Sequence, residues 1–295
     1  MTAEWGRALG QVGVTRASIG VQTFAPHCQI AIGREQDEAM IARSVDWLRV
    51  AGVASLNFDL MYGLPTQSYA DLEDSHERTQ RLGADRVAVF GYAHVPHFVP
   101  RQRVIDASAL PPSETRFKLA QRSYEHLTQS GYKPIGFDHF AMPDDPMAKA
   151  ARTGALRRNF QGFTDDPSPT LIGLGASAIS GFPGLYAQNE KNAGRYRMQT
   201  SQGRLTATHG VVRSREDQWR GRMIEELRSH SRAKLSPCLL GPMAARLEPF
   251  IERGLAQLSG LDLIVTKAGL PYARVIASLL DQYRQHSATA FSAAI

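Results

Sequence analysis

Residues 55–65 read SLNFDLMYGLP, a strand-like apolar run that contains the polar residues Asn57 and Asp59. Successive side chains of a β-strand point to opposite faces, so Ser55, Asn57 and Asp59 share one face. The apolar residues between them share the other face. A buried carboxylate costs several kcal/mol unless another group compensates it. The polar face of this strand is therefore expected to meet a polar partner or a bound ligand.

Residues 15–23 form a second strand-like stretch with the same two-faced pattern, in which Ser18, Gly20 and Gln22 alternate with apolar residues. Helices must cover the apolar faces of parallel strands, so the polar faces are expected to line the inside of a barrel or partial barrel. Gln22 and Asp59 would lie toward the carboxyl ends of their strands, where parallel α/β proteins place ligand sites. A polar lumen of this kind predicts a polar ligand.

Arg34 lies on the loop before the next helix, and its guanidinium is suited to a ligand carboxylate. For Asp59 the alternative is an ion pair with a basic side chain, or a cap on a neighbouring turn. Three coordinated polar residues favour the ligand interpretation over that alternative.

Strand-like and helix-like segments alternate along the first half of the chain. Strand ends recur at intervals of roughly 35 residues, as expected for successive βα units. We predict an α/β fold, with a partial (β/α) barrel over residues 1–200 and a smaller α-rich C-terminal domain over residues 201–295. The segments are predicted strands at 15–23, 54–61, 85–92 and 133–140 and predicted helices at 37–51, at 68–82, from 113 to a point before Gly131, and beyond 215.

The composition is that of an ordinary globular protein, with 43% hydrophobic and 21% charged residues among 295. No apolar run approaches the roughly 20 residues of a membrane span. The N-terminal residues lack the layout of a secretory signal, so a cytoplasmic location is expected. The net charge of +6 suits an anionic small molecule and weak nucleic-acid contact about equally, and does not decide between them.

The cysteines Cys28 and Cys238 lie far apart, which predicts neither a disulfide framework nor a C-x-x-C metal site. His27 and His94 lack partners at ligand spacing. The stretch 138–145, DHFAMPDD, offers acids and one histidine for a hard metal, but without a second histidine we interpret it as a solvated acidic loop. We therefore predict no metal ligands in this chain.

Seven stretches carry a resemblance to a known family: SIGVQTF, REQDE, FDLMYGLPTQ, GYAHVP, QSGYKPIGFDHFAMPDD, RNFQGF and LGASAIS, in that order. They resemble the oxygen-independent coproporphyrinogen III oxidases, also called coproporphyrinogen III dehydrogenases, which are radical S-adenosylmethionine (SAM) enzymes of haem synthesis. The resemblance runs from about Arg7 to Tyr283. GFDHFA and RNFQGF favour the dehydrogenase over its haem-chaperone relatives.

The resemblance implies a partial barrel of the radical SAM type whose lumen holds a [4Fe-4S] cluster and two SAM molecules. A helical C-terminal domain would close over the substrate. The family positions that bind SAM match Gln22, Arg34, Asp59, Ala93 and Ile179 of this chain.

The implied reaction is the oxidative decarboxylation of two propionates of coproporphyrinogen III to vinyl groups, which gives protoporphyrinogen IX. Neither nucleic acid nor a membrane is an expected partner. Arg101, Arg103 and Arg158 are our candidates for contacts to the propionates, because a guanidinium is suited to a carboxylate. The alternative for each of them is a solvated surface arginine.

The sequence departs from the family in its cysteines. The family's cluster-binding C-x-x-x-C-x-x-C and its glycine-rich G-G-G-T-P do not occur in these 295 residues. Cys28 and Cys238 cannot supply the three protein thiolates that the cluster needs, and catalytic residues stay unassigned. We expect the C-terminal part of a family enzyme, truncated or split, and inactive alone. The alternatives are a non-catalytic half-barrel that binds SAM or a tetrapyrrole and complements a separate N-terminal half, or a chain without function.

Overall fold

A computed structural model of the chain describes residues 1–284 and divides them into two compact units. The first unit is Met1–Lys149, and the second begins at Ala150. Helix α6 (Pro146–Thr153) runs through the division. Each unit has its own hydrophobic core. No helix among the described residues is both long enough and apolar enough to cross a membrane.

The first unit is a five-stranded sheet with helices between its strands. The strand order is β1-β2-β3-β5-β4, with β1, β2 and β3 parallel. The parallel βα units expected from the sequence are therefore present. The elements are α1 (Ala3–Gln11), β1 (Arg16–Gln22), α2 (Pro26–Ala31), α3 (Glu38–Val50), β2 (Ser55–Tyr62), α4 (Tyr69–Arg81), β3 (Arg86–Gly91), the 3-10 helices η1 (Pro100–Val104) and η2 (Ala107–Ala109), α5 (Ser113–Gln129), β4 (Lys133–Ile135) and β5 (His139–Ala141).

The end of this sheet differs from the sequence prediction. One strand was expected for KPIGFDHF, whereas the structure has the two short strands β4 and β5, paired antiparallel. Gly136 between them has a φ of +64°, a left-handed conformation that glycine adopts without the steric cost of a side chain. The chain therefore reverses, and β5 pairs antiparallel with β3.

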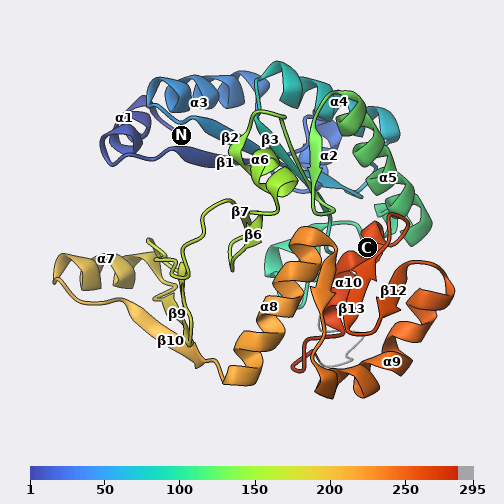
Figure 1. Cartoon of the computed structure of the whole chain (residues 1–295). Coiled ribbons are helices and arrows are strands. Elements are labelled where there is room, and N and C mark those ends of the chain that lie inside the picture. The colour runs from blue at the N-terminus through green and yellow to red at the C-terminus, as the bar shows by residue number, and fades with distance from the viewer. Residues whose placement is uncertain (285–295) are drawn as a thin grey trace. The chain divides into compact units, whose positions relative to one another are not determined.

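The helices α3, α4 and α5 lie along one face of the sheet (Figure 1). Leu56, Phe58 and Leu60 of β2 are fully buried in the core on this side. Helix α3 begins at the capping residue Asp37, and α4 begins with a capping box of Ser68 and Asp71. Because the helices cover the apolar face, the opposite face, here called the lumen face, carries the polar side chains.

The strand register aligns the side chains of the lumen face in two rows. Residues that pair across neighbouring strands point to the same face. The lower row, nearer the amino ends of the parallel strands, is Ser18, Asn57, Arg86 and Ala141. The upper row is Gly20, Asp59, Ala88 and His139.

A buried ion pair holds the lower end of the lumen face. Arg86 Nε donates to both carboxylate oxygens of Asp145, at 2.8 and 2.9 Å, and Ser55 Oγ donates to Oδ2 at 2.8 Å. The side chains of Arg86 and Asp145 are 9% and 2% exposed. Asp145 also accepts from Met147 N at 2.7 Å, at the start of α6. The interpretation of this stretch as a solvated loop is therefore wrong for Asp145, because these bonds bury its carboxylate.

The second unit, in its described residues, is built from antiparallel strand pairs together with two long and two short helices. A hairpin of β6 and β7 precedes the sheet β10-β9-β8, and the sheet β11-β13-β12 packs with α8, α9 and α10. Its elements are β6 (Arg157–Arg158), β7 (Phe163–Thr164), β8 (Ile179–Phe182), β9 (Leu185–Asn189), α7 (Ala193–Ser201), β10 (Ala207–Val212), α8 (Arg215–His230), β11 (Arg232–Lys234), α9 (Pro237–Glu252), β12 (Ala256–Ser259), β13 (Asp262–Val265), η3 (Leu270–Tyr272) and α10 (Ala273–Ser278).

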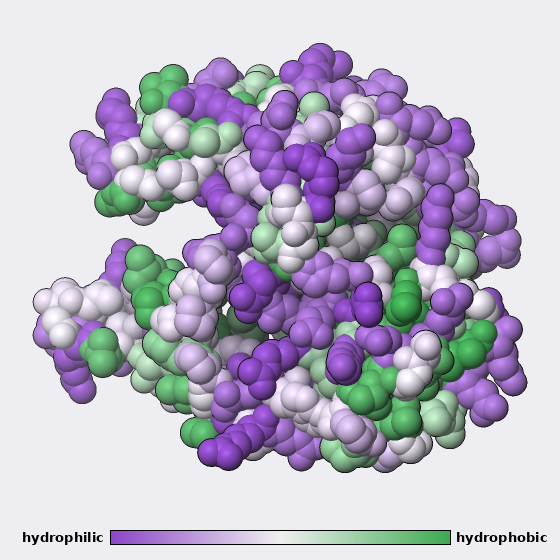
Figure 2. All heavy atoms as spheres, viewed as in Figure 1, coloured by the Kyte–Doolittle hydropathy of each residue, from purple (hydrophilic) through white to green (hydrophobic). Residues whose placement is uncertain are grey.

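The division after Lys149 does not coincide with the boundary predicted after Thr200. A boundary there would cut the sheet of the second unit, because Asn189 of β9 pairs with Ala207 of β10. The predicted α-rich part corresponds to α8, α9 and α10 around a small sheet, and residues 285–295 of the predicted domain lie outside the described residues. Strand β10 is exposed along its whole length, and Figure 2 shows hydrophobic residues at the surface of the region that holds α7, β9 and β10.

Replacing Asp145 by Ala is expected to destabilise the first unit by about 3–5 kcal/mol, because it leaves Arg86 buried without its counter-charge. Urea unfolding, followed by tryptophan fluorescence, measures the loss in the free energy of unfolding. A Trp219→Phe background leaves Trp5 and Trp47, both in the first unit, as the probes.

Glu114→Ala is the matched control, since it removes the exposed pair that Glu114 forms with Lys118 at 2.7 Å. Exposed pairs of this kind contribute little to stability, so Glu114→Ala should unfold at nearly the same urea concentration as the unmodified chain. Equal losses in the two variants would contradict the assigned importance of the buried pair.

Candidate functional site

Ser18, Asn57 and Asp59 form a hydrogen-bonded trio on the lumen face. Ser18 Oγ donates to Asp59 Oδ2 at 2.9 Å, and Asn57 Nδ2 donates to Asp59 Oδ1 at 2.7 Å and to Ser18 Oγ at 2.9 Å. Within residues 1–284, no arginine or lysine forms an ion pair with Asp59. The carboxylate is therefore held in place by two neutral side chains.

The ends of the Arg34 and Gln22 side chains both lie close to Gly20. Gly20 pairs in register with Asp59. Arg34 Nη2 donates to the carbonyl oxygen of Gly20 at 2.8 Å. A Cβ at residue 20 would lie 3.0 Å from Arg34 Nη2 and 3.0 Å from Gln22 Nε2. The absence of a side chain at Gly20 thus lets the guanidinium and the amide approach the same point of the lumen face.

Gln22 has a φ of +70°, and the register of β1 shifts between Gly20 and Gln22. Such a bulge bends the end of a strand and changes the direction of a side chain. It brings the Gln22 amide back over Gly20. The structure therefore places Gln22, Arg34 and Asp59, three of the residues singled out from the sequence, around one small area.

Two acceptor atoms of this area are buried without a hydrogen-bond partner among the described residues, namely Gln22 Oε1 and Asn57 Oδ1. Leaving a buried acceptor unpaired costs about 1–3 kcal/mol. Together with the Asp59 carboxylate they offer three acceptors beside the Arg34 guanidinium. This combination is suited to a ligand that carries hydroxyl or ammonium donors as well as a carboxylate.

Ala93 lies in the loop after β3, and Gln102 holds that loop. Gln102 Nε2 donates to the carbonyl oxygen of Ala93 at 2.9 Å, while its Oε1 accepts from Val95 N at 2.6 Å. Neither the role of Gln102 nor the space above Gly20 is predicted by the sequence. No motif signals either feature, because both depend on contacts that exist only in the folded chain.

The remaining predicted residues lie in two different units. Arg101 and Arg103 are exposed on η1, in the first unit. Ile179 begins β8 and Arg158 ends β6, both in the second unit. The Arg158 guanidinium lies 4.5 Å from the centroid of the Phe163 ring, and its backbone N donates to Glu225 Oε1 at 3.2 Å. Contacts of these residues to a ligand stay predictions.

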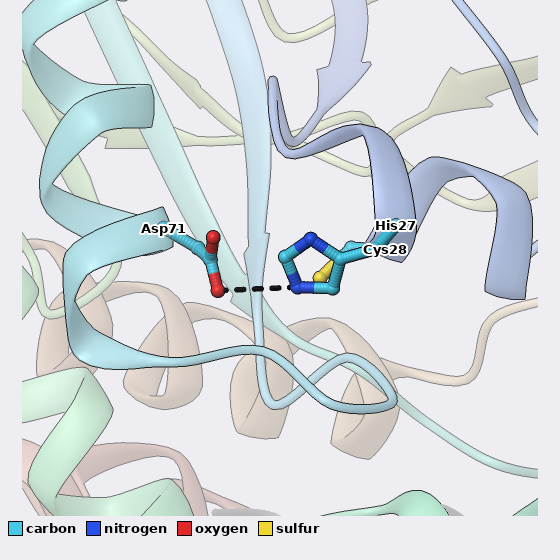
Figure 3. A group of neighbouring side chains, drawn as sticks. All are labelled: His27, Cys28 and Asp71. Atoms are coloured by element: carbon cyan, nitrogen blue, oxygen red, sulfur yellow. Dashed lines mark ion pairs between the residues drawn. The ribbon is translucent and has the colours of Figure 1, made fainter.

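His27, Cys28 and Asp71 lie close together where α2 approaches the start of α4 (Figure 3). His27 Nε2 is 3.3 Å from Asp71 Oδ2, and that oxygen also accepts from the backbone N and Oγ of Ser68. Burial, and secondarily the charge of Asp71, raise the pKa of the Cys28 thiol to about 11. The thiol is therefore protonated and donates to Pro65 O at 3.6 Å. Helix capping and hydrogen bonding explain this group, and we assign no metal to it.

The sequence matches no family model. It is 43% identical to the oxygen-independent coproporphyrinogen III oxidase of Paracoccus denitrificans over 98% of this chain and 65% of that protein. The protein of the same name from Thermostichus vulcanus is 38% identical, over 97% of this chain and 91% of its own length. The chain thus spans less than two thirds of the length of the first of these relatives.

A solved structure of the Escherichia coli coproporphyrinogen III oxidase, described as a radical SAM enzyme, superposes with a TM-score of 0.84. It is 35% identical, with 96% of this chain and 68% of that chain covered. This similarity confirms the predicted α/β fold of the radical SAM type.

Proposed function

Because this chain belongs to the family of oxygen-independent coproporphyrinogen III oxidases, which are radical SAM enzymes, we propose that its lumen face binds SAM. The observation that carries this proposal is the convergence of Arg34, Gln22 and the trio of Ser18, Asn57 and Asp59 on one area.

The chemistry of these residues fits the amino-acid end and the ribose of SAM. The ammonium and the ribose hydroxyls of SAM are donors, which suit the unpaired acceptors Gln22 Oε1 and Asn57 Oδ1 and the Asp59 carboxylate. The carboxylate of SAM suits the Arg34 guanidinium. When bound, SAM supplies the radical chemistry of the family, and the residues of this chain bind and orient it. Ala93 and Ile179 are proposed as further SAM contacts, and a second SAM molecule is an extension of the same proposal.

We extend the proposal to the substrate. The family resemblance points to coproporphyrinogen III and to the conversion of two of its propionates to vinyl groups. Arginines are suited to hold propionate carboxylates, and Arg101 and Arg103 are exposed and so accessible to an anionic ligand. Arg158 is proposed for the same role. The cytoplasmic location and the absence of a nucleic-acid partner stay predictions.

The two thiols of this chain do not fit a [4Fe-4S] cluster. Clusters of this kind are held by thiolates, whereas the buried Cys28 thiol has a pKa raised to about 11 and donates a hydrogen bond. Cys238 is exposed in the second unit. We therefore propose that this chain alone binds SAM without cleaving it.

A second candidate function is complementation of a separate N-terminal half that carries the cluster. Strand β1 pairs with β2 on one side, and within the described residues its other edge pairs with no strand. An unpaired edge is a template for a strand of another chain. A strand added there would continue the sheet beside Gly20 and the trio.

Isothermal titration of the full chain with SAM tests the first proposal. Gly20→Ala places a Cβ 3.0 Å from the flexible ends of Arg34 and Gln22. We expect both to shift and the affinity for SAM to fall by about tenfold or more, as expected for a lost charge-assisted hydrogen bond.

The matched control is Gly241→Ala in α9, where a Cβ would have open space. It should leave the affinity unchanged. The proposal fails if the unmodified chain binds no SAM, and the assignment of the site fails if the two variants bind SAM equally well.

Complementation is tested by mixing the chain with a partner polypeptide that carries C-x-x-x-C-x-x-C, after reconstitution with iron and sulfide. SAM is then added together with a chemical reductant, which supplies the electrons that the cleavage of SAM consumes. We expect 5′-deoxyadenosine from the mixture and none from either polypeptide alone. The same partner with its cysteines replaced by alanine is the control. A mixture that yields no product would argue against this second function, and product from this chain alone would refute the proposal that it does not cleave SAM.

A further inference from the structure

His139, the first residue of β5, lies on the lumen face outside the area described above, and Asp138 precedes it in the chain. His139 pairs in register with Ala88, and Ala88 pairs with Asp59. The imidazole and the Asp59 carboxylate therefore point to the same side of the sheet, two strands apart. Neighbouring strands are about 4.8 Å apart, so about 10 Å separates these residues across the sheet. Phe140, the next residue, is buried in the core on the opposite face, as the alternation requires.

Asp138 fixes the orientation of His139. Its Oδ1 lies 2.6 Å from His139 Nδ1, and both side chains are mostly buried. The imidazole also packs edge-on against the ring of Phe90, with a centroid distance of 5.5 Å and an interplanar angle of 80°. A histidine hydrogen-bonded to a carboxylate through one ring nitrogen has a fixed tautomer and ring direction. Such preorganisation is typical of a side chain that contacts a ligand.

The upper row of the lumen face contains two residues that can hydrogen-bond a ligand through their side chains. These are Asp59 and His139, because Gly20 and Ala88, the other members of the row, carry no polar side-chain atom. An elongated ligand that lies along this row therefore has one polar contact at each end.

We propose that His139, oriented by Asp138, is a SAM-binding residue that contacts the end of the ligand farthest from Asp59. This inference rests on the proposed SAM site and extends it from β1 and β2 across the sheet to β5. Asp138 is a positioning residue in this arrangement, and His139 is the residue that touches the ligand.

Titration of the full chain with SAM tests the inference through three variants of His139. His139→Ala removes the hydrogen-bonding group and should weaken SAM binding about tenfold, which corresponds to one hydrogen bond. His139→Phe keeps a ring of similar size against Phe90 and should lose as much affinity as the alanine variant. His139→Gln restores a polar group and should recover part of the loss, a rescue that a merely structural role would not produce. Asp138→Asn should weaken binding less than His139→Ala.

His209→Ala is the matched control. His209 Nδ1 also bonds its sequence neighbour, at 3.0 Å from Thr208 Oγ1, but His209 lies on the exposed strand β10 of the second unit. Its replacement should leave SAM binding unchanged. Melting temperatures measured without SAM show which variants fold. If His139→Ala does not fold, His139→Phe and His139→Gln test the inference in its place.

The outcomes separate the two proposals. If the unmodified chain binds no SAM, the proposed function fails and this inference fails with it. If the unmodified chain binds SAM and Asp59→Asn weakens that binding while the folded His139 variants bind normally, this inference alone is overturned.

Discussion

The alternation of side chains in β2 is the constraint on which the candidate site depends. Leu56, Phe58 and Leu60 must be buried against the helices, so the residues between them are forced onto the lumen face. A shift of one residue would bury Asp59 in the apolar core and expose three large side chains. The hydrophobic core therefore fixes the direction of the Asp59 carboxylate, although the core itself takes no part in ligand binding.

The site also keeps features that a purely structural sheet would avoid. Gln22 adopts a positive φ without being glycine, and two acceptor atoms of the site are buried without a hydrogen-bond partner in the described part of the chain. Both features cost stability in the free protein. A ligand that donates to these acceptors would offset part of that cost. The packing of the helices against the sheet and the Arg86–Asp145 pair hold the strands in place. The strands therefore keep their positions although the site itself is destabilising.

The sequence predicts those parts of the fold that depend on local periodicity. The strands β1, β2 and β3 and the shared face of Asn57 and Asp59 follow from alternation and spacing. The position of Gln22 beside Asp59 does not, because the register shift after Gly20 pairs Gln22 with Leu60. Features that depend on distant contacts do not follow. The burial of Asp145 requires Arg86, 59 residues away in sequence, and the role of Gln102 requires the loop that it holds. The hairpin that KPIGFDHF forms depends on the left-handed conformation of Gly136.

Hydrogen–deuterium exchange of the full chain, with and without saturating SAM, tests the central claim that the lumen face is the SAM site. Binding to the folded state suppresses local opening around the ligand. The account predicts slower exchange in peptides that cover residues 18–24, 32–36 and 57–63, and unchanged exchange in strand β10. Unchanged exchange in those three segments, or slower exchange confined to the second unit, would contradict it.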